Sequence, residues 1–127
     1  MAEHSTFDYA VIRIVPRVER EEFINAGVIL FARTLRYLDA RVTLPRERLA
    51  SFGAALDLEE LALHLEQIPR ICAGDPAAGT IATLPQHERW HWLVAPRSTI
   101  LQTSSVHSGL CTDPRHELEH LMQRLVL

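Results

Sequence analysis

The chain of 127 residues contains no lysine, and its 13 basic residues are all arginines. Without lysine, the protein has no amine for a Schiff base, no lysine general base and no P-loop lysine to hold a nucleotide phosphate. GC-rich coding is the simplest explanation of this bias. Its chemical consequence is that each basic side chain can make planar, two-pronged contacts to a carboxylate or phosphate, which arginine makes better than lysine.

Long hydrophobic runs are also missing. No stretch of 18 apolar residues occurs, so we expect no membrane-spanning helix. The N-terminal sequence MAEHSTFDYA lacks the basic and apolar regions of a signal peptide, which predicts a cytoplasmic protein. The cysteines, Cys72 and Cys111, do not form a Cys-x-x-Cys motif. They are expected to be free thiols in a reducing compartment; a single disulfide is the alternative, and nothing in the sequence supports it.

Size and charge limit the function classes further. A chain of this length forms one domain and buries roughly two thirds of its unfolded surface, so it needs no disulfide or metal for stability. Hydrophobic residues make up 47% of the chain, as is typical of a globular protein. The net charge of −3 argues against a nucleic-acid binder with a broad basic surface and leaves room only for a local basic patch.

The first third of the chain predicts three strands. Residues 7–15 are apolar on both faces, with Arg13 as the polar interruption. Residues 28–32 contain no polar side chain and are expected in the centre of a sheet. Residues 37–44 alternate between apolar and polar side chains, as in a strand near a sheet edge, and residues 33–36 are short enough for a hairpin loop.

The rest of the chain predicts helices and a fourth strand. Helices are expected over residues 45–52, over residues 58–72 and from Pro114 onward, the last with a buried stripe of Leu118, Leu121, Met122 and Leu125. Pro69 predicts a kink or an early stop near Gln67. Residues 84–95 fit a helix or a strand, and the helix is favoured. Residues 99–106 are rich in β-branched and hydroxyl side chains and predict the strand.

The order of these elements predicts the fold class. We expect an α+β fold in which a small, mainly antiparallel sheet of about four strands is covered by helices. The sequence shows no repeat and no low-complexity linker, so a single domain is expected over residues 1–127. Residues 1–6 are expected to form a disordered N-terminal tail.

The sharpest motif is HERWH at residues 87–91, which matches H-E-x-x-H. On a helix, His87 and His91 lie one turn apart and can bind one Zn²⁺, with Glu88 as general base. The extended zinc-hydrolase pattern fails, because Val94 stands in place of a glycine and Arg97 in place of the third histidine. We therefore expect no cofactor, with zinc at His87, Glu88 and His91 as the alternative.

Two questions about zinc stay open at this stage. A remote third ligand, such as His107 or Glu117, would complete the first site. A second match to H-E-x-x-H covers residues 116–120. Its histidines point directly away from the predicted apolar stripe of the last helix, so they are expected on the solvated face, where no dry catalytic cavity can form.

A second group of polar residues follows Pro96. Its members offer hydroxyl, amide, imidazole and guanidinium groups: Arg97, Ser98, Thr99, Gln102, Thr103, Ser104, Ser105, His107 and Ser108. Such groups near the start of a strand can hold a phosphate or a carboxylate. The alternative, which we favour, is an edge strand whose hydroxyl groups meet water. Ser105 and His107 lack a carboxylate partner and a nucleophile elbow, so they do not indicate a hydrolase triad.

A third group comprises Arg13, Glu22 and Asn25. A guanidinium within an apolar strand needs a partner, and Glu22 is the expected partner of Arg13. Asn25 is expected to shape a turn before Gly27. A structural role is favoured for this group. Arg13 and Asn25 nevertheless stay candidate ligand-binding residues, because Arg13 could converge on the same site as Arg97.

Two stretches of the chain carry a family resemblance. The first is Tyr9, Arg13 and Pro16 followed by Glu22-Phe23-x-Asn25-x-Gly27-Val28-x-Leu30-Phe31, and the second is Trp92-Leu93, Ala95-Pro96-Arg97-Ser98-Thr99, Gln102 and Val106-His107-x-Gly109. Together they resemble the bacterial domain-of-unknown-function family 3037 (DUF3037), over nearly the whole chain. The resemblance implies a bacterial cytosolic protein and no particular activity. Such proteins are sometimes encoded beside kinases resembling the persistence kinase of toxin–antitoxin pairs, so the resemblance also implies a partner role.

Three hypotheses about function follow. The leading one is a non-catalytic protein-interaction or regulatory module whose partner is another protein, such as that kinase, or a second copy of the chain; Trp90 and Trp92 could form its contact patch. The second is a small anion- or nucleotide-binding domain centred on Arg97 and residues 98–108. The third is a zinc-dependent hydrolase built on the motif at residues 87–91. Whether the protein is an enzyme stays open, with a binding role favoured.

Overall fold

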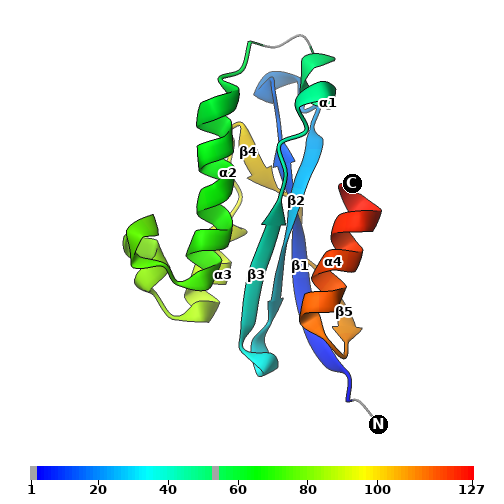
Figure 1. Ribbon diagram of the computed structural model, residues 1–127, viewed down its shortest axis with the longest axis vertical. Helices are drawn as coiled ribbons and strands as arrows, with labels where there is room; N and C mark the ends of the chain where they lie inside the picture. The colour runs from blue at the N-terminus through cyan, green and yellow to red at the C-terminus, as the bar shows by residue number, and fades with distance from the viewer. Residues whose placement is uncertain (1–2, 53–54) are drawn as a thin grey trace.

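The computed structural model describes residues 3–52 and 55–127, and within them five strands and four α-helices form three layers (Figure 1). The strands are β1 (Ser5–Ile14), β2 (Ile24–Ala32), β3 (Tyr37–Val42), β4 (Leu101–Thr103) and β5 (His107–Cys111). The helices are α1 (Arg46–Ala50), α2 (Leu58–Ala73), α3 (Gln86–Leu93) and α4 (Pro114–Leu125). Helices α2 and α3 cover one face of the sheet, and α4 lies on the other. The α+β fold predicted from the sequence is confirmed.

Strand β1 is the centre of the sheet and is paired along both of its edges. On one side it pairs with β2, which in turn pairs with β3; on the other side it pairs with β5 and β4. Every pairing is antiparallel. Because β4 and β5 lie end to end beside β1, the sheet is four positions wide, although the described residues contain five strands. Strand β3 lies at an outer edge, as its alternating sequence predicts.

The edge strand predicted over residues 99–106 is interrupted, and the prediction was wrong in its extent. Strand β4 pairs with residues 12–14 of β1 and β5 with residues 5–9. Between these segments, residues 104–106 lie opposite only residues 10 and 11, which is a β-bulge. The buried Ser104 accepts a hydrogen bond on its Oγ from the N–H of Val11 at 2.9 Å, in place of the ladder bond that the bulge breaks.

The core consists of two apolar clusters, one on each face of the sheet. Ala10, Ile12 and Ile14 of β1 point into the cluster under α2 and α3, since alternate residues of a strand face the same side. Phe7 points to the opposite side, where the predicted stripe of α4 packs. Leu118, Leu121 and Met122 of that stripe are fully buried and Leu125 is partly buried, so the stripe is confirmed.

Helix α2 continues past its proline. The stop predicted near Gln67 was wrong, because the helix runs to Ala73 and ends at Gly74 in the left-handed conformation that glycine adopts readily. The last carbonyl groups of α2 are held from outside the helix. The guanidinium of Arg89 in α3 donates to the carbonyls of Ile71 at 3.0 Å and Cys72 at 2.6 Å. These bonds stabilise the turn that follows Pro69.

The N-terminal segment differs from its prediction, whereas the cysteines agree with theirs. Strand β1 begins at Ser5, so Ser5 and Thr6, predicted to belong to a disordered tail, pair instead with β5. Residues 1 and 2 of that tail lie outside the described residues. Cys72 and Cys111 are buried free thiols, as expected. Among the described residues, no helix is both long and apolar enough to cross a membrane.

The bulge at Ser104 predicts a measurable dependence on one hydroxyl group. Ser104→Ala should lower the free energy of unfolding by about 1–3 kcal/mol, because it leaves the N–H of Val11 buried without an acceptor. The neighbouring Ser105→Ala is the matched control and should change stability by less than about 0.5 kcal/mol, since Ser105 is exposed. Urea denaturation of both variants measures the difference. Equal stabilities would show that the hydroxyl of Ser104 does not support the bulge.

The environment of Tyr37 predicts that the free energy of unfolding falls in alkaline solution. Burial, followed by the charge of Asp39, raises the pKa of Tyr37 to about 12. The folded state therefore favours the neutral phenol, and this contribution is intact below the ordinary pKa of about 10 and is lost as the pH rises towards about 12. Subtracting the phenolate absorbance titration of Tyr37→Phe from that of the wild type should leave a component centred near 12. A component centred near the ordinary tyrosine value would contradict the burial argument.

Candidate functional site

The largest hollow with apolar walls runs between α2 and the segment that enters β4; we call it the α2–β4 groove. It consists of two adjoining cavities of about 610 Å³ and 240 Å³, which share His64, Thr99 and Leu101. Apolar side chains form much of its wall: Leu56, Leu61, Ile68, Ile71 and Leu93. Two apolar side chains beside it, Ile100 and Trp92, are each 41% exposed. Strand β4 pairs with β1 alone among the described strands, so no described strand covers its other edge.

Arg97 is bound within the chain at one end of the groove. Its Nη2 donates to the carbonyl of Trp92 at 2.7 Å and its Nη1 to the carbonyl of Leu93 at 3.1 Å. The guanidinium also stacks on the Trp92 ring, 4.5 Å from its centre. Arg97 thus caps the last turn of α3 and holds the exposed Trp92 in place. An anion at this position would have to compete with two carbonyl groups.

The polar residues after Arg97 form a turn. The hydroxyl of Thr99 donates to the carbonyl of Leu101 at 2.8 Å, and the amide of Gln102 donates to the carbonyl of Thr99 at 2.8 Å. Ser98 is exposed and lines the larger cavity. These bonds fix residues 99–102 so that Ile100 is presented to solvent. Polar groups predicted as ligand contacts therefore shape the backbone beside the groove.

Arg13 and Arg97 are not brought together. Arg13 alternates along β1 with Ile12 and Ile14, whose side chains lie under α2 and α3, so its own side chain is on the α4 side of the sheet. Arg97 lines the groove on the opposite side. His107 also lies on the α4 side, where it stacks on Tyr9 with ring centres 5.3 Å apart. Ser105 is exposed at the bulge.

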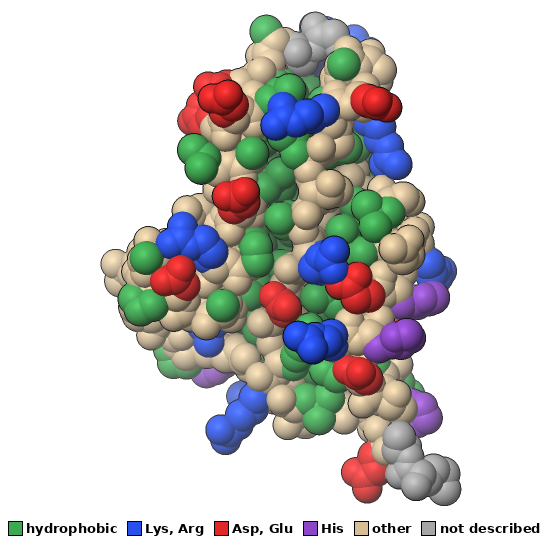
Figure 2. All heavy atoms as spheres, viewed as in Figure 1, with side chains coloured by type: hydrophobic (Ala, Val, Ile, Leu, Met, Phe, Trp, Pro, Cys, Tyr) green, Lys and Arg blue, Asp and Glu red, His purple; other side chains and the backbone are tan. Residues whose placement is uncertain are grey.

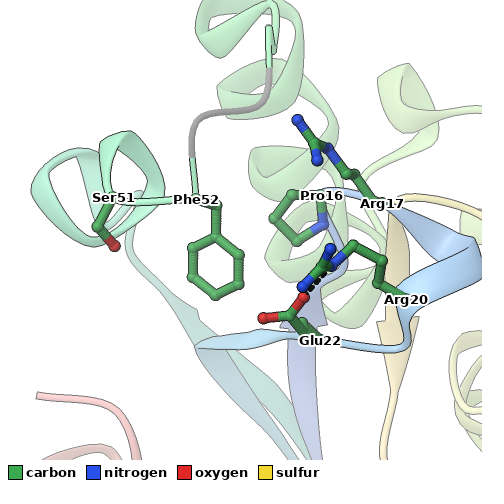
Figure 3. A pocket seen from close by; sticks show the side chains of 6 residues that line it. All are labelled: Pro16, Arg17, Arg20, Glu22, Ser51 and Phe52. Carbon is green, nitrogen blue, oxygen red and sulfur yellow. Dashed lines mark hydrogen bonds and ion pairs between the residues drawn. The ribbon is translucent and has the colours of Figure 1, made fainter.

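Glu22, the expected partner of Arg13, is paired with another arginine. Its carboxylate binds the Nε of Arg20, in a polar pocket of about 390 Å³ between the β1–β2 connection and the end of α1 (Figure 3). In this pocket the Arg17 guanidinium points away from the ion pair. Arg20 and Glu22 are 60% and 49% exposed, so water solvates both. Asn25, expected in a turn, lies in β2 and donates its amide to the carbonyl of Leu125 at 2.9 Å.

The H-E-x-x-H motif lies on α3, and the residues that face inward are those at its two x positions, Arg89 and Trp90. Trp90 is 4% exposed and packs against Phe31, and Arg89 binds the end of α2. The rings of His87 and His91 are 6.5 Å apart and Glu88 is exposed. The described residues contain no group of three His, Cys, Asp or Glu side chains that could hold a metal ion. The histidines of the second match, at residues 116–120, are exposed on α4.

Several residues of the groove were missed in the sequence. His64, Gln67 and Ile68 of α2 form one wall, but in the sequence they belong to an ordinary amphipathic helix. Ile100 was taken as an interior position of a strand. These two segments are more than 30 positions apart in the sequence, and no local sequence pattern predicts that they form one groove. The Arg-Ser-Thr step after Pro96 was the one local signal, and it marks the correct side of the groove.

Within this motif, Arg89 is expected to contribute to the stability of the fold, and the two histidines are not. Arg89→Gln should lower the free energy of unfolding by about 1–3 kcal/mol, because three carbonyl groups lose a charged donor: those of Leu84, Ile71 and Cys72. His87→Ala is the matched control on the same helix and should melt like the wild type. Treatment with a chelator should leave both melting curves unchanged. Stoichiometric zinc, together with a lower melting temperature after chelation, would instead support a metal site at His87 and His91.

Comparison with known proteins agrees with the family resemblance. No curated protein and no solved structure matches the chain. A family described as "Protein of unknown function (DUF3037)" matches residues 9–126. The match includes all the strands and helices described above, from within β1 to the end of α4. The chain therefore belongs to the DUF3037 family.

Proposed function

We propose that this protein is a non-catalytic interaction module of the bacterial cytoplasm that binds a protein partner in the α2–β4 groove. The observation that carries the proposal is the combination of an open apolar groove with the exposed side chains of Trp92 and Ile100 beside it. Clusters of exposed apolar side chains beside a hollow are typical of protein-binding sites. Arg97, Thr99 and Gln102 beside this groove are engaged within the chain, which favours contact over catalysis.

The two exposed side chains suit the energetics of binding. Tryptophan is among the residues that contribute most to protein interfaces, because a large ring loses contact with water on binding. Covering the exposed parts of Trp92 and Ile100 would contribute roughly 1–2 kcal/mol each at about 25 cal/mol per Å² of apolar surface. Arg97 lowers the entropic cost of binding, since it already holds the Trp92 ring in one position. The groove is thus preorganised for an apolar segment.

The charges near the groove bear on the choice of partner. Asp57 and Glu60 of the α2 wall line the larger cavity, and His64 lies 3.9 Å from Glu60. A segment with apolar side chains and a basic flank would match this surface. The kinase implied by the family resemblance is one candidate partner, and a second copy of this chain is another. The anion-binding alternative centred on Arg97 has less support, because its guanidinium is bound to two carbonyls.

Substitution in the groove should separate binding from folding. We expect the tagged protein to capture one stoichiometric partner from its host, and Ile100→Glu to reduce that capture about tenfold or more, because a carboxylate would be desolvated in an apolar contact. Trp92→Ala should act in the same direction. Leu63→Glu is the matched control, since Leu63 is 62% exposed on α2 and does not line the groove. Mass spectrometry of the captured proteins measures the ratio.

Two outcomes would contradict the proposal. Equal capture by wild type, Ile100→Glu and Leu63→Glu would place the partner elsewhere on the surface. A wild-type protein that stays monomeric and captures nothing would remove the interaction role itself. If sedimentation shows a homodimer that Ile100→Glu dissociates, the partner is a second copy of the chain.

A further inference from the structure

Arg13 differs from the other partly buried arginines of the chain. Four arginines are partly buried in the described residues: Arg13, Arg70, Arg89 and Arg97. Arg70 binds the carboxylate of Asp75 at 3.0 Å, and Arg89 and Arg97 each donate to backbone carbonyls. Arg13 has no hydrogen-bond or ion-pair partner within the described residues, although its Nε is fully buried. A partly desolvated guanidinium without an acceptor is costly, so this residue needs an explanation.

The surroundings of Arg13 hold its guanidinium in a defined place. It stacks on the ring of Phe23, 4.0 Å from the ring centre. Its direct neighbours across the sheet are Asn25 on β2 and Gln102 on β4, so the three polar side chains form a row on the α4 side. The Oδ1 of Asn25 is also buried without a partner and is an acceptor suited to the Nε of Arg13. This inner contact would leave the two Nη groups, which are not fully buried, for another acceptor.

The carboxylate of Glu22 and the backbone carbonyls at the end of α4 already accept bonds from other residues. Glu22, two residues before β2, binds Arg20. The C-terminal end of α4 reaches the row, but the carbonyl of Leu125 accepts from Asn25 and the carbonyl of Val126 accepts from Arg48 at 3.1 Å. The described part of the chain therefore offers Arg13 no carboxylate within ion-pair distance.

We propose that Arg13 anchors an oxyanion, a carboxylate or a phosphate, on the side of the sheet that carries α4. Nη1 and Nη2 donate to two oxygens of the anion, a two-pronged geometry that guanidinium groups favour. Phe23 stacks on the guanidinium and fixes its plane. This site lies on the face opposite the α2–β4 groove, so it is a second binding site that does not depend on the interaction proposed for the groove.

Adding a ligand stepwise while the arginine side-chain signals are followed tests the site directly. The Nε–Hε signals of the wild-type protein would be followed by nuclear magnetic resonance while inorganic phosphate, succinate or a short glutamate peptide is added at constant ionic strength. We expect a saturable shift of the Arg13 signal with at least one probe. A response to phosphate or succinate identifies a free small anion, and a response to the peptide alone identifies an acidic segment of a partner protein.

Variants complete the test. Arg13→Gln should weaken the binding of the responding probe about tenfold or more, as the loss of a charge-assisted pair of hydrogen bonds implies. Arg33→Gln is the matched control, because it removes the same charge from an exposed turn at residues 33–35. If Arg13→Gln does not fold, Arg13→Lys assigns the signal and the wild-type titration decides. An Arg13 signal that none of the three probes moves, or equal weakening by Arg33→Gln, would overturn the proposal.

Discussion

The carbonyl groups at the ends of the helices are the constraint on which the arrangement of this protein depends. The last four carbonyls of an α-helix have no donor within the helix, and a buried carbonyl without a donor is costly. Here the donors come from other elements: Arg89 serves the end of α2, Arg97 the end of α3, and Asn25 and Arg48 the end of α4. Three of these four donor residues, Arg89, Asn25 and Arg48, lie in a different element from the helix end that they bind, so their bonds also fix α2 against α3, and α4 against β2 and α1.

This use of arginine determines the character of the two faces of the sheet. On the α2 side, Arg89 and Arg97 both donate to carbonyls, and the exposed side chains beside the groove include the apolar Trp92 and Ile100. On the α4 side, Asn25 and Arg48 donate to the carbonyls at the end of α4, and the guanidinium of Arg13 has no acceptor among the described residues. Figure 2 shows hydrophobic side chains between α2 and the sheet, and histidines along the side of the molecule that carries α4. The two proposed sites therefore differ in their chemistry, with apolar contact on one face of the sheet and an anion on the other.

Local patterns predicted the elements well and their long-range partners poorly. Helices were expected from residues 58 and 114, and the preceding Asp57 and Asp113 each accept a backbone N–H of the first turn. The bulge at Ser104 was missed because its partner, Val11, is 93 residues away and a serine in a hydroxyl-rich run carries no special signal. Glu22 was assigned to Arg13 because the two are close in sequence, whereas Arg20 is closer still and takes the carboxylate. The polar stretch after Pro96 was a candidate ligand-binding segment and lies beside a hollow, whose wall on α2 could not be seen from periodicity alone.

The groove itself follows from a mismatch in length between a helix and the strand at the edge of the sheet. Helix α2 has 16 residues and is about 24 Å long, whereas β4 has three residues and spans about 10 Å. Beyond β4, the bond from the N–H of Val15 to the carbonyl of Ile100 is the last contact of that segment with the β1 edge, and the chain then turns away towards Arg97. Leu61, near the start of α2, is buried in the core and also lines the larger cavity of the groove. A partner segment in the groove would therefore lie where the sheet is too short for the helix that covers it.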